Sequence, residues 1–268
     1  MKVNILDTAN NKVGQMELPK QFGEEVRYDI ISRAVLALQS QKRQKYGASP
    51  EAGKRSSAKL SRRRRNYRGS YGLGISRSPR KIVSRSGIRF NWVGAFAPYT
   101  VGGRRAHPPK AEKEWSKKIN KKEKKKAIRS AIAATMAKEV VEKRGHIIPE
   151  MFPFIVDEKI ESISKTSEAV EALEKLGFGE ELERAKVRKV RAGRGKTRGR
   201  KYKTKTSILI VVSKQGNISN AARNIPGIDV VEAKSLNAEI LAPGAVPGRL
   251  TLWTKSAIES LRKESLFM

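Results

Sequence analysis

Apolar residues recur at steps of three and four in two long stretches of the chain, which predicts two amphipathic helices. The first helix is expected over residues 24–44, with its stripe at Val26, Ile30, Ala34, Val35 and Leu38. The second is expected over residues 115–144, with its stripe at Ile128, Ile132, Met136 and Val140 and a stop at Gly145. Shorter helices are predicted over residues 168–176, capped by Ser167, and over residues 217–223 and 256–263.

Six short runs, β-branched or apolar, predict strands. They cover residues 3–7, 13–18, 154–157, 207–212, 229–231 and 250–253. The run SILIVV at residues 207–212 is almost wholly apolar, which is typical of a strand covered on both faces. Strands that alternate with helices predict the α/β fold class, with a mostly parallel sheet and helices on both of its sides.

Two basic segments carry nearly all of the net charge of +32. Residues 42–105 hold 18 Lys and Arg against one acid, Glu51, and residues 184–205 hold 12 Lys and Arg and no acid. We therefore predict a near-neutral globular core, residues 1–44 and 112–268, with a long basic extension at 45–111 and a second basic loop at 184–205. Fixed positive charge of this density indicates a polyanionic partner.

Several function classes are disfavoured by what the sequence lacks. The absence of cysteine removes disulfides, thiolate catalysis and cysteine–zinc sites. The longest apolar run, residues 208–212, is far short of the ~20 residues of a membrane span, so no membrane partner is expected. The opening MKVNILDTAN has no signal-peptide pattern, which predicts an intracellular, cytoplasmic protein. His107 and His146 are the only histidines, so neither a metal nor another cofactor is expected.

The first basic segment interleaves arginine with isolated aromatic rings. Its rings are Tyr46, Tyr67, Tyr71, Phe90, Trp92, Phe96 and Tyr99. Guanidinium groups bind phosphates, and flat rings stack on unpaired bases, so this pattern favours irregular RNA. A solvated, disordered linker is the alternative, but large aromatic residues such as Trp92 and Phe96 are not typical of such a linker. The lysine-rich residues 115–126 fit a solvated helix face and a set of phosphate contacts equally well.

The second basic segment contains a Gly-Lys-Thr sequence at residues 195–197, which invites comparison with a phosphate-binding loop. The first glycine of that pattern would fall on Val190, and no buried strand precedes it. A flexible Arg/Gly loop that folds onto RNA phosphates is the better interpretation. Asp7 and Asp157 end predicted strands, where α/β enzymes often place catalytic acids, but neither has a visible partner.

Nine sequence blocks together resemble one family. They are LPKQF (18–22), VRYDIISRAVLALQ (26–39), RQKYG (43–47), GGRRAHPPK (102–110), INKKEKKKAIRSAIAAT (119–135), RAGRGKTRGRKYK (191–203), SILIVVS (207–213), NAARNIPG (220–227) and GRLTLWTKSAIESL (248–261). In these blocks the chain resembles the ribosomal protein L4 family of the large subunit, in its archaeal/eukaryotic form.

The resemblance implies a three-layer α/β/α, Rossmann-like core on the outer surface of the large subunit and no enzyme activity. It also implies early action in subunit assembly, with large-subunit (23S) rRNA, neighbouring ribosomal proteins and the nascent polypeptide as partners. The long loop would run inward to the polypeptide exit tunnel, with its tip at Arg68, Gly69, Ser70, Tyr71, Gly72, Leu73, Gly74, Ile75, Ser76 and Arg77. The expected rRNA contacts are Arg43, Lys45, Arg55, Arg62, Arg63, Arg64, Arg65, Arg68, Arg80, Lys81, Arg85, Arg89, Trp92, Arg104, Arg105, His107, Lys110, Arg188, Lys189, Arg191, Arg194, Lys196, Arg198, Arg200 and Lys201.

Two other functions fit parts of the sequence. An RNA-modifying enzyme with a dinucleotide-binding core would need a glycine-rich turn after the first strand, where the chain has TANNKVGQ instead. A DNA-compacting protein fits the composition, but scattered aromatic rings favour irregular RNA over a duplex.

Overall fold

The computed structural model describes all 268 residues and divides into two compact units. Residues 1–42 and 116–268 form one unit, here called the core. Residues 43–115 form the other, here called the arm.

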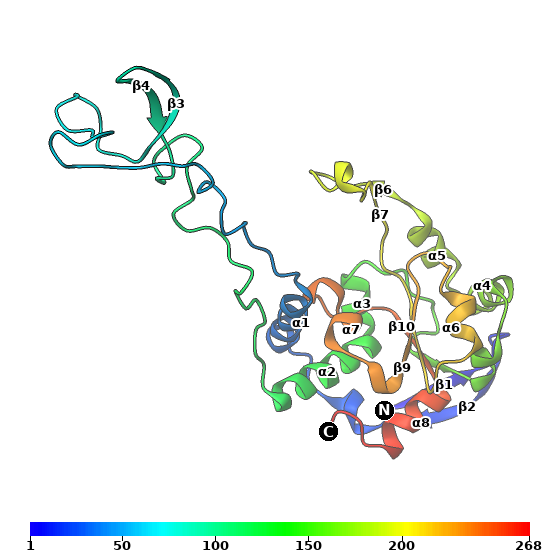
Figure 1. Ribbon diagram of the computed structural model, residues 1–268. Coiled ribbons are helices and arrows are strands. Elements are labelled where there is room, and N and C mark those ends of the chain that lie inside the picture. Colours follow the sequence, from blue (N-terminus) through cyan, green and yellow to red (C-terminus); the bar gives the residue numbers. More distant parts are fainter. The chain divides into compact units, whose positions relative to one another are not determined.

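The core contains a six-stranded, mostly parallel sheet with the order β2-β1-β5-β10-β8-β9, drawn in Figure 1. Its strands are β1 (Lys2–Leu6), β2 (Lys12–Glu17), β5 (Phe154–Val156), β8 (Leu209–Val212), β9 (Asp229–Glu232) and β10 (Thr251–Thr254). Only β2 runs antiparallel to its neighbour, and the other pairs are parallel. The predicted α/β class and mostly parallel sheet are therefore confirmed, and all six predicted strands exist.

Helices lie on both faces of this sheet because alternate strand residues point to opposite sides. On one face, Ile155, Val211 and Trp253 pack against α1 (Tyr28–Lys42), α2 (Lys121–Met136), α7 (Ala238–Leu241) and α8 (Lys255–Lys263). On the other, Val156, Ile210 and Leu252 pack against α3 (Lys138–Lys143), α4 (Thr166–Lys175), α5 (Gly179–Lys186) and α6 (Asn217–Ala222). Besides η3 (Lys196–Arg198) in the second basic loop, the core has four short 3-10 turns: η1 (Lys20–Gly23), η2 (Glu158–Ser162), η4 (Ala233–Ser235) and η5 (Pro243–Ala245).

Trp253 of β10 contacts helix α2 and the turn η1 from the sheet. Its side chain is fully buried, its indole Nε1–H donates to Thr135 Oγ1 at 3.2 Å, and Phe22 of η1 packs edge-on at 5.0 Å between ring centroids. Burial of a ring of this size, with its one polar atom satisfied, contributes strongly to stability.

The predicted helix boundaries were partly wrong. The helix expected from residue 24 begins at Tyr28. Residues 25–27 are not helical, and the buried hydroxyl of Ser130 holds them: it accepts from the Arg27 amide at 2.7 Å and donates to Glu25 O at 2.8 Å. The helix expected over 115–144 begins at Lys121 and breaks at Ala137, whose ψ of 104° is extended. Ser167 does not cap α4, which has Lys165 at that position. Helices α5 and α7 were not predicted.

Candidate nucleic-acid interface

Positive charge in the arm has no carboxylate partner. The arm holds 19 Lys and Arg and three Glu, yet every ion pair in the structure joins residues of the core. Most expected contact side chains are exposed here: Arg43, Lys45, Arg55, Arg62, Arg63, Arg64, Arg65, Lys81, Arg85, Arg89, Arg105, His107 and Lys110. Arg68, Arg80, Trp92 and Arg104 are half-buried. These cations are therefore available to an external polyanion.

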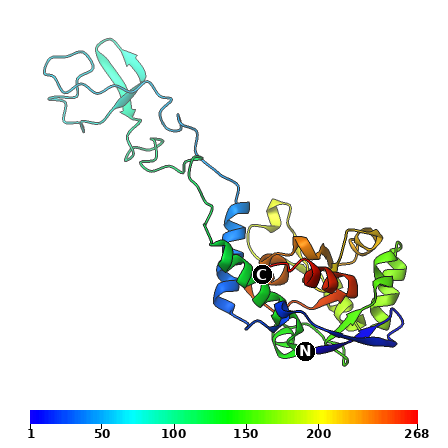
Figure 2. The ribbon, with the colours of Figure 1, turned by 90° about the horizontal axis from the view of Figure 1, so that it is seen from below.

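The arm contains a β-hairpin that the sequence analysis missed. Strands β3 (Arg80–Ser86) and β4 (Arg89–Gly94) pair antiparallel around Gly87-Ile88, with Ile82 opposite Trp92 and a bulge before Ser84 (Figure 2). Phe90 and Trp92, two residues apart on β4, lie on the less exposed side of the strand. No strand was predicted in this segment.

Aromatic rings supply the small packed centre of this hairpin. The Phe90 ring centroid lies 5.7 Å from Trp92 and 5.5 Å from Tyr67, the latter edge-on. The Arg85 guanidinium lies 5.8 Å from the Phe90 centroid and 6.0 Å from that of Tyr67. These rings therefore have a structural role in the arm whether or not they also stack on bases.

The predicted tip, residues 68–77, is a turn with one anchored residue. Ser70 is buried, and its amide donates to Ser61 O at 3.2 Å. The guanidinium groups of Arg64 and Arg77 lie 5.0 and 5.4 Å from the Tyr71 ring centroid, and Arg64 Nη2 donates to the Tyr71 hydroxyl at 3.1 Å. Arg68, Gly69 and Ile75 are half-buried, and the other side chains of the tip besides Ser70 are exposed.

A second aromatic cluster gathers expected contact residues at the two ends of the arm sequence. Tyr46 stacks on Trp115 with centroids 5.7 Å apart, and the Arg43 guanidinium lies 3.7 Å from the Trp115 centroid. Arg105, His107 and Lys110 line a cavity of about 620 Å³ with these two rings. The structure therefore brings together three expected contacts that lie more than 50 positions from Tyr46.

Gly103 marks a close approach of backbone segments within the arm. A Cβ on Gly103 would lie 2.0 Å from Ala97 O and 2.5 Å from Thr100 Oγ1, so Gly103→Ala must open the turn. Because steric overlap of this kind costs ~1–3 kcal/mol, amide hydrogen exchange at residues 100–104 should accelerate about tenfold. Gly102→Asn is the control, since nothing lies within 4 Å and Asn tolerates its φ of +71°. Equal exchange in both variants would contradict the close approach.

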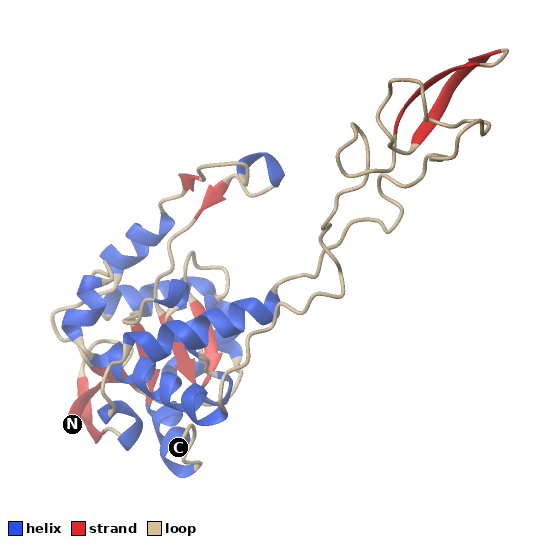
Figure 3. Cartoon of the chain, turned by 90° about the vertical axis from the view of Figure 1, so that its left-hand side faces the viewer, coloured by secondary structure: helices blue, strands red, loops and turns tan.

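The second basic loop is a short hairpin that extends from the core, visible beyond α5 in Figure 3. Strands β6 (Lys189–Val190) and β7 (Tyr202–Lys203) pair antiparallel, with η3 (Lys196–Arg198) at the far end. Arg191 folds back, its Nε donating to Arg200 O at 3.2 Å. The other expected contacts are exposed and without carboxylate partners: Arg188, Lys189, Arg194, Lys196, Arg198, Arg200 and Lys201. Residues 195–197 lie in this turn, with no helix of the phosphate-loop kind after them.

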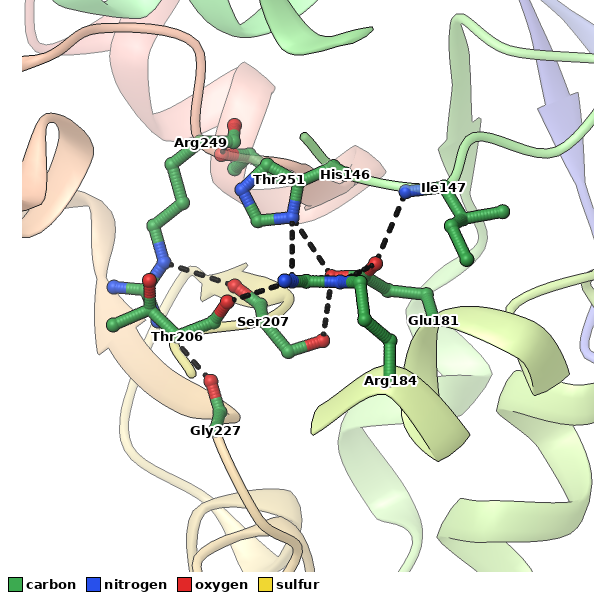
Figure 4. Close-up of polar contacts among 9 residues, drawn as sticks. All are labelled: His146, Ile147, Glu181, Arg184, Thr206, Ser207, Gly227, Arg249 and Thr251. Carbon is green, nitrogen blue, oxygen red and sulfur yellow. Dashed lines mark hydrogen bonds and ion pairs between the residues drawn. The ribbon is translucent and has the colours of Figure 1, made fainter. Parts of the chain in front are cut away.

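A buried ionic network lies where this loop leaves the core (Figure 4). The Glu181 carboxylate, on α5, is 1% exposed. It accepts from Arg184 Nε and Nη2, both at 2.6 Å, and from His146 Nδ1 at 2.7 Å. The Ser207 hydroxyl and the Ile147 amide donate to it at 3.0 and 3.1 Å. Burial raises the pKa of Glu181, but the hydrogen bonds from Arg184, His146 and Ile147 outweigh it and lower the pKa to about 2.

Sequence reasoning missed this network because its members are far apart. His146, Glu181 and Ser207 come from three separate segments, and no local pattern links them. It anchors α5 to the segment just before β8, and these two parts of the chain flank the second basic loop. The structure has no group of three His, Cys, Asp or Glu residues placed to hold a metal, and no helix long and apolar enough to cross a membrane.

Comparison with known proteins places the chain in a family. The Ribosomal protein L4/L1 family profile matches residues 16–264. A "Large ribosomal subunit protein uL4" of Nanoarchaeum equitans is 51% identical over 268 residues, which is 100% of both chains. Proteins of the same name from Archaeoglobus fulgidus and Halobacterium salinarum are 47% and 45% identical over 97% of this chain and 98% and 99% of their own lengths. The chain therefore belongs to the ribosomal protein L4/L1 family.

Proposed function

We propose that this protein is a non-enzymatic structural component of the large ribosomal subunit in the cytoplasm, held there by its rRNA. The observation that carries the proposal is the set of exposed cations in the arm and the second basic loop that have no carboxylate partner. Family membership supports it, since the archaeal relatives named above bear the name of a large-subunit protein. Neighbouring ribosomal proteins are the further partners.

We propose a division of labour between the two units. The core, with helices on both faces of its sheet in a Rossmann-like arrangement, sets the docking position and supports early subunit assembly. The arm contacts several rRNA segments, and its tip at residues 68–77 forms part of the wall of the polypeptide exit tunnel, beside the nascent chain. The half-buried Trp92 and Arg68 act in the fold of the arm as well as in contact with RNA.

Co-sedimentation tests the proposed function directly. Quantitative mass spectrometry across a sucrose gradient of cell lysate is expected to find the protein in stoichiometric amount with the large subunit, at moderate and at high salt. A sub-stoichiometric or salt-stripped protein would contradict a structural role and indicate an assembly factor or a modifying enzyme.

Binding of the isolated chain to large-subunit rRNA should depend steeply on salt. If 6–10 of the unpaired cations contact phosphates, affinity is expected to fall ~10³–10⁵-fold between 50 and 200 mM salt, because each contact releases condensed counterions. Filter binding over a salt series measures the slope. Competing duplex DNA should leave most of the rRNA complex intact, and equal competition by duplex DNA would contradict a preference for structured RNA.

A further inference from the structure

A cationic cavity of about 680 Å³ lies in the core beside the base of the second basic loop. Its basic lining residues are Lys143, Arg144, Arg184, Lys189, Lys203 and Lys205, and no Asp or Glu lines it. These residues come from the end of α3, from α5 and from both strands of the basic hairpin. Cavities of this size hold small ligands or single groups of larger ones.

Most of the charge inside this cavity is not neutralised by the protein, because Arg184 alone among its six basic lining residues pairs with a carboxylate, that of Glu181. Arg144 has no carboxylate partner: its guanidinium donates to the carbonyls of Pro243, at 2.7 Å, and of Val246. Desolvation and repulsion from Arg249 and Arg184 lower the pKa of Arg144 to about 10. The nearest buried carboxylate, Glu181, already accepts five hydrogen bonds. Lys143, Lys189, Lys203 and Lys205 make no ion pair, so an anion in the cavity would relieve their repulsion.

We propose that this cavity is a phosphate-binding site that takes a phosphodiester group of an RNA strand. Arg144 presents a planar, positionally fixed guanidinium, which suits bidentate contact with phosphate oxygens. The lysines around it add mobile positive charge. The inference rests on the proposed rRNA binding, and it adds Lys143 and Arg144 of the core to the contacts expected of the second basic loop.

An RNA strand fits this cavity better than a free anion does because the cavity is continuous with the basic hairpin. Lys189 and Lys203 belong both to the cavity lining and to the paired strands β6 and β7. Beyond them the hairpin carries exposed cations to its far end at Arg198. Successive phosphates of one strand would therefore meet the hairpin and then the cavity.

The first test compares two double variants of the full-length chain in binding to transcribed large-subunit rRNA. Lys143→Gln/Lys205→Gln is expected to weaken binding about tenfold and to lower the salt slope by ~1, as expected for the loss of one or two charge-assisted phosphate contacts. Lys12→Gln/Lys214→Gln removes the same charge from exposed lysines outside the cavity and without ion pairs, so it should change affinity far less. Equal effects of the two double variants would overturn the proposal.

The second test places the RNA directly. Because the chain has no cysteine, a single one can be introduced at Val187, which lines the cavity and is 50% exposed, and loaded with a photoactivatable RNA cross-linker. Val13→Cys, at a 62% exposed position on β2, is the control. Cross-links from position 187 and not from 13 are expected. If neither position cross-links, in protein that still binds rRNA, the cavity is not an RNA site, and the proposed function still stands. Failure of the wild type to bind rRNA would overturn both the cavity site and the proposed function.

Titration with inorganic phosphate alone distinguishes a site for a free anion from a site for an RNA strand. Binding weaker than millimolar is expected, because one phosphate lacks the neighbouring contacts that the hairpin offers to a strand. Tight phosphate binding that rRNA does not displace would overturn the RNA assignment.

Discussion

Replacing residues 59–89 of the arm with a short Gly-Ser linker is expected to weaken binding to large-subunit rRNA about 10³-fold at physiological salt. The segment carries 11 Lys and Arg and no acid. If about half of them contact phosphates, and each contributes ~0.7 to the salt slope, the loss amounts to roughly three powers of ten at 0.15 M salt. Filter binding with the full-length and linker proteins over one salt series measures both the affinity and the slope.

A matched variant separates charge from shape in this experiment. Replacing the three clustered rings, Tyr67, Phe90 and Trp92, with leucine keeps every cation and removes the packed centre of the hairpin. The leucine variant should keep the salt slope of the wild type but bind rRNA with lower affinity. Without its packed centre the arm is disordered, and ordering it on binding costs free energy. The linker protein should still enter the large subunit through its core. Its absence from the particle, or an unchanged affinity for rRNA, would contradict the proposed roles of core and arm.

Glu181→Gln is expected to lower the free energy of unfolding by about 3–5 kcal/mol. The substitution leaves the side chains of Arg184 and His146 facing an uncharged amide, and breaking a buried ion pair on one side costs about this much. Chemical denaturation followed by far-ultraviolet circular dichroism measures the loss. Glu183→Gln, two positions away and exposed, is the control and should stay within about 0.5 kcal/mol of the wild type.

The Glu181 carboxylate also makes the free energy of unfolding depend on pH. Its pKa is lowered from 4.5 to about 2 in the folded protein, so the folded state favours the charged form. This contribution, on the order of 3 kcal/mol, is present above pH 4.5 and is lost as the pH falls from there towards 2. Glu181→Gln should remove that part of the acid dependence, and identical pH profiles of the two proteins would contradict it.

The sheet was predictable because its strands are short apolar runs with a local signal. The break of the second long helix was not, since Ala137 is neither glycine nor proline and only tertiary packing interrupts the helix there. Helix α5 was missed because the basic segment was taken to begin at Arg184, in the middle of this helix. Glu180 and Glu181 in its first turn are nevertheless typical of a helix start. The hairpin of the arm did carry a signal, the alternation of Phe90 and Trp92 after a Ser-Gly turn, which the density of charge obscured.

The exposure of the expected contact residues was predictable from the sequence, but the surface that they form was not. Clustered arginines and lysines in the sequence lie exposed in the structure, as their charge requires. The cationic cavity was not visible in the sequence, because Lys143 and Arg144 end an ordinary core helix and meet the basic hairpin only through the fold. The network around Glu181 was hidden for the same reason: its partners are joined by tertiary contacts alone.

The distribution of tryptophan between the two units gives the protein a built-in pair of optical reporters. Trp253 lies fully buried in the core, while Trp92 and Trp115 belong to the arm and are only half-buried. With both arm indoles replaced by phenylalanine, intrinsic fluorescence would report unfolding of the core alone. With Trp253 replaced instead, quenching of the remaining emission would report binding of the arm to RNA in real time, without any attached dye.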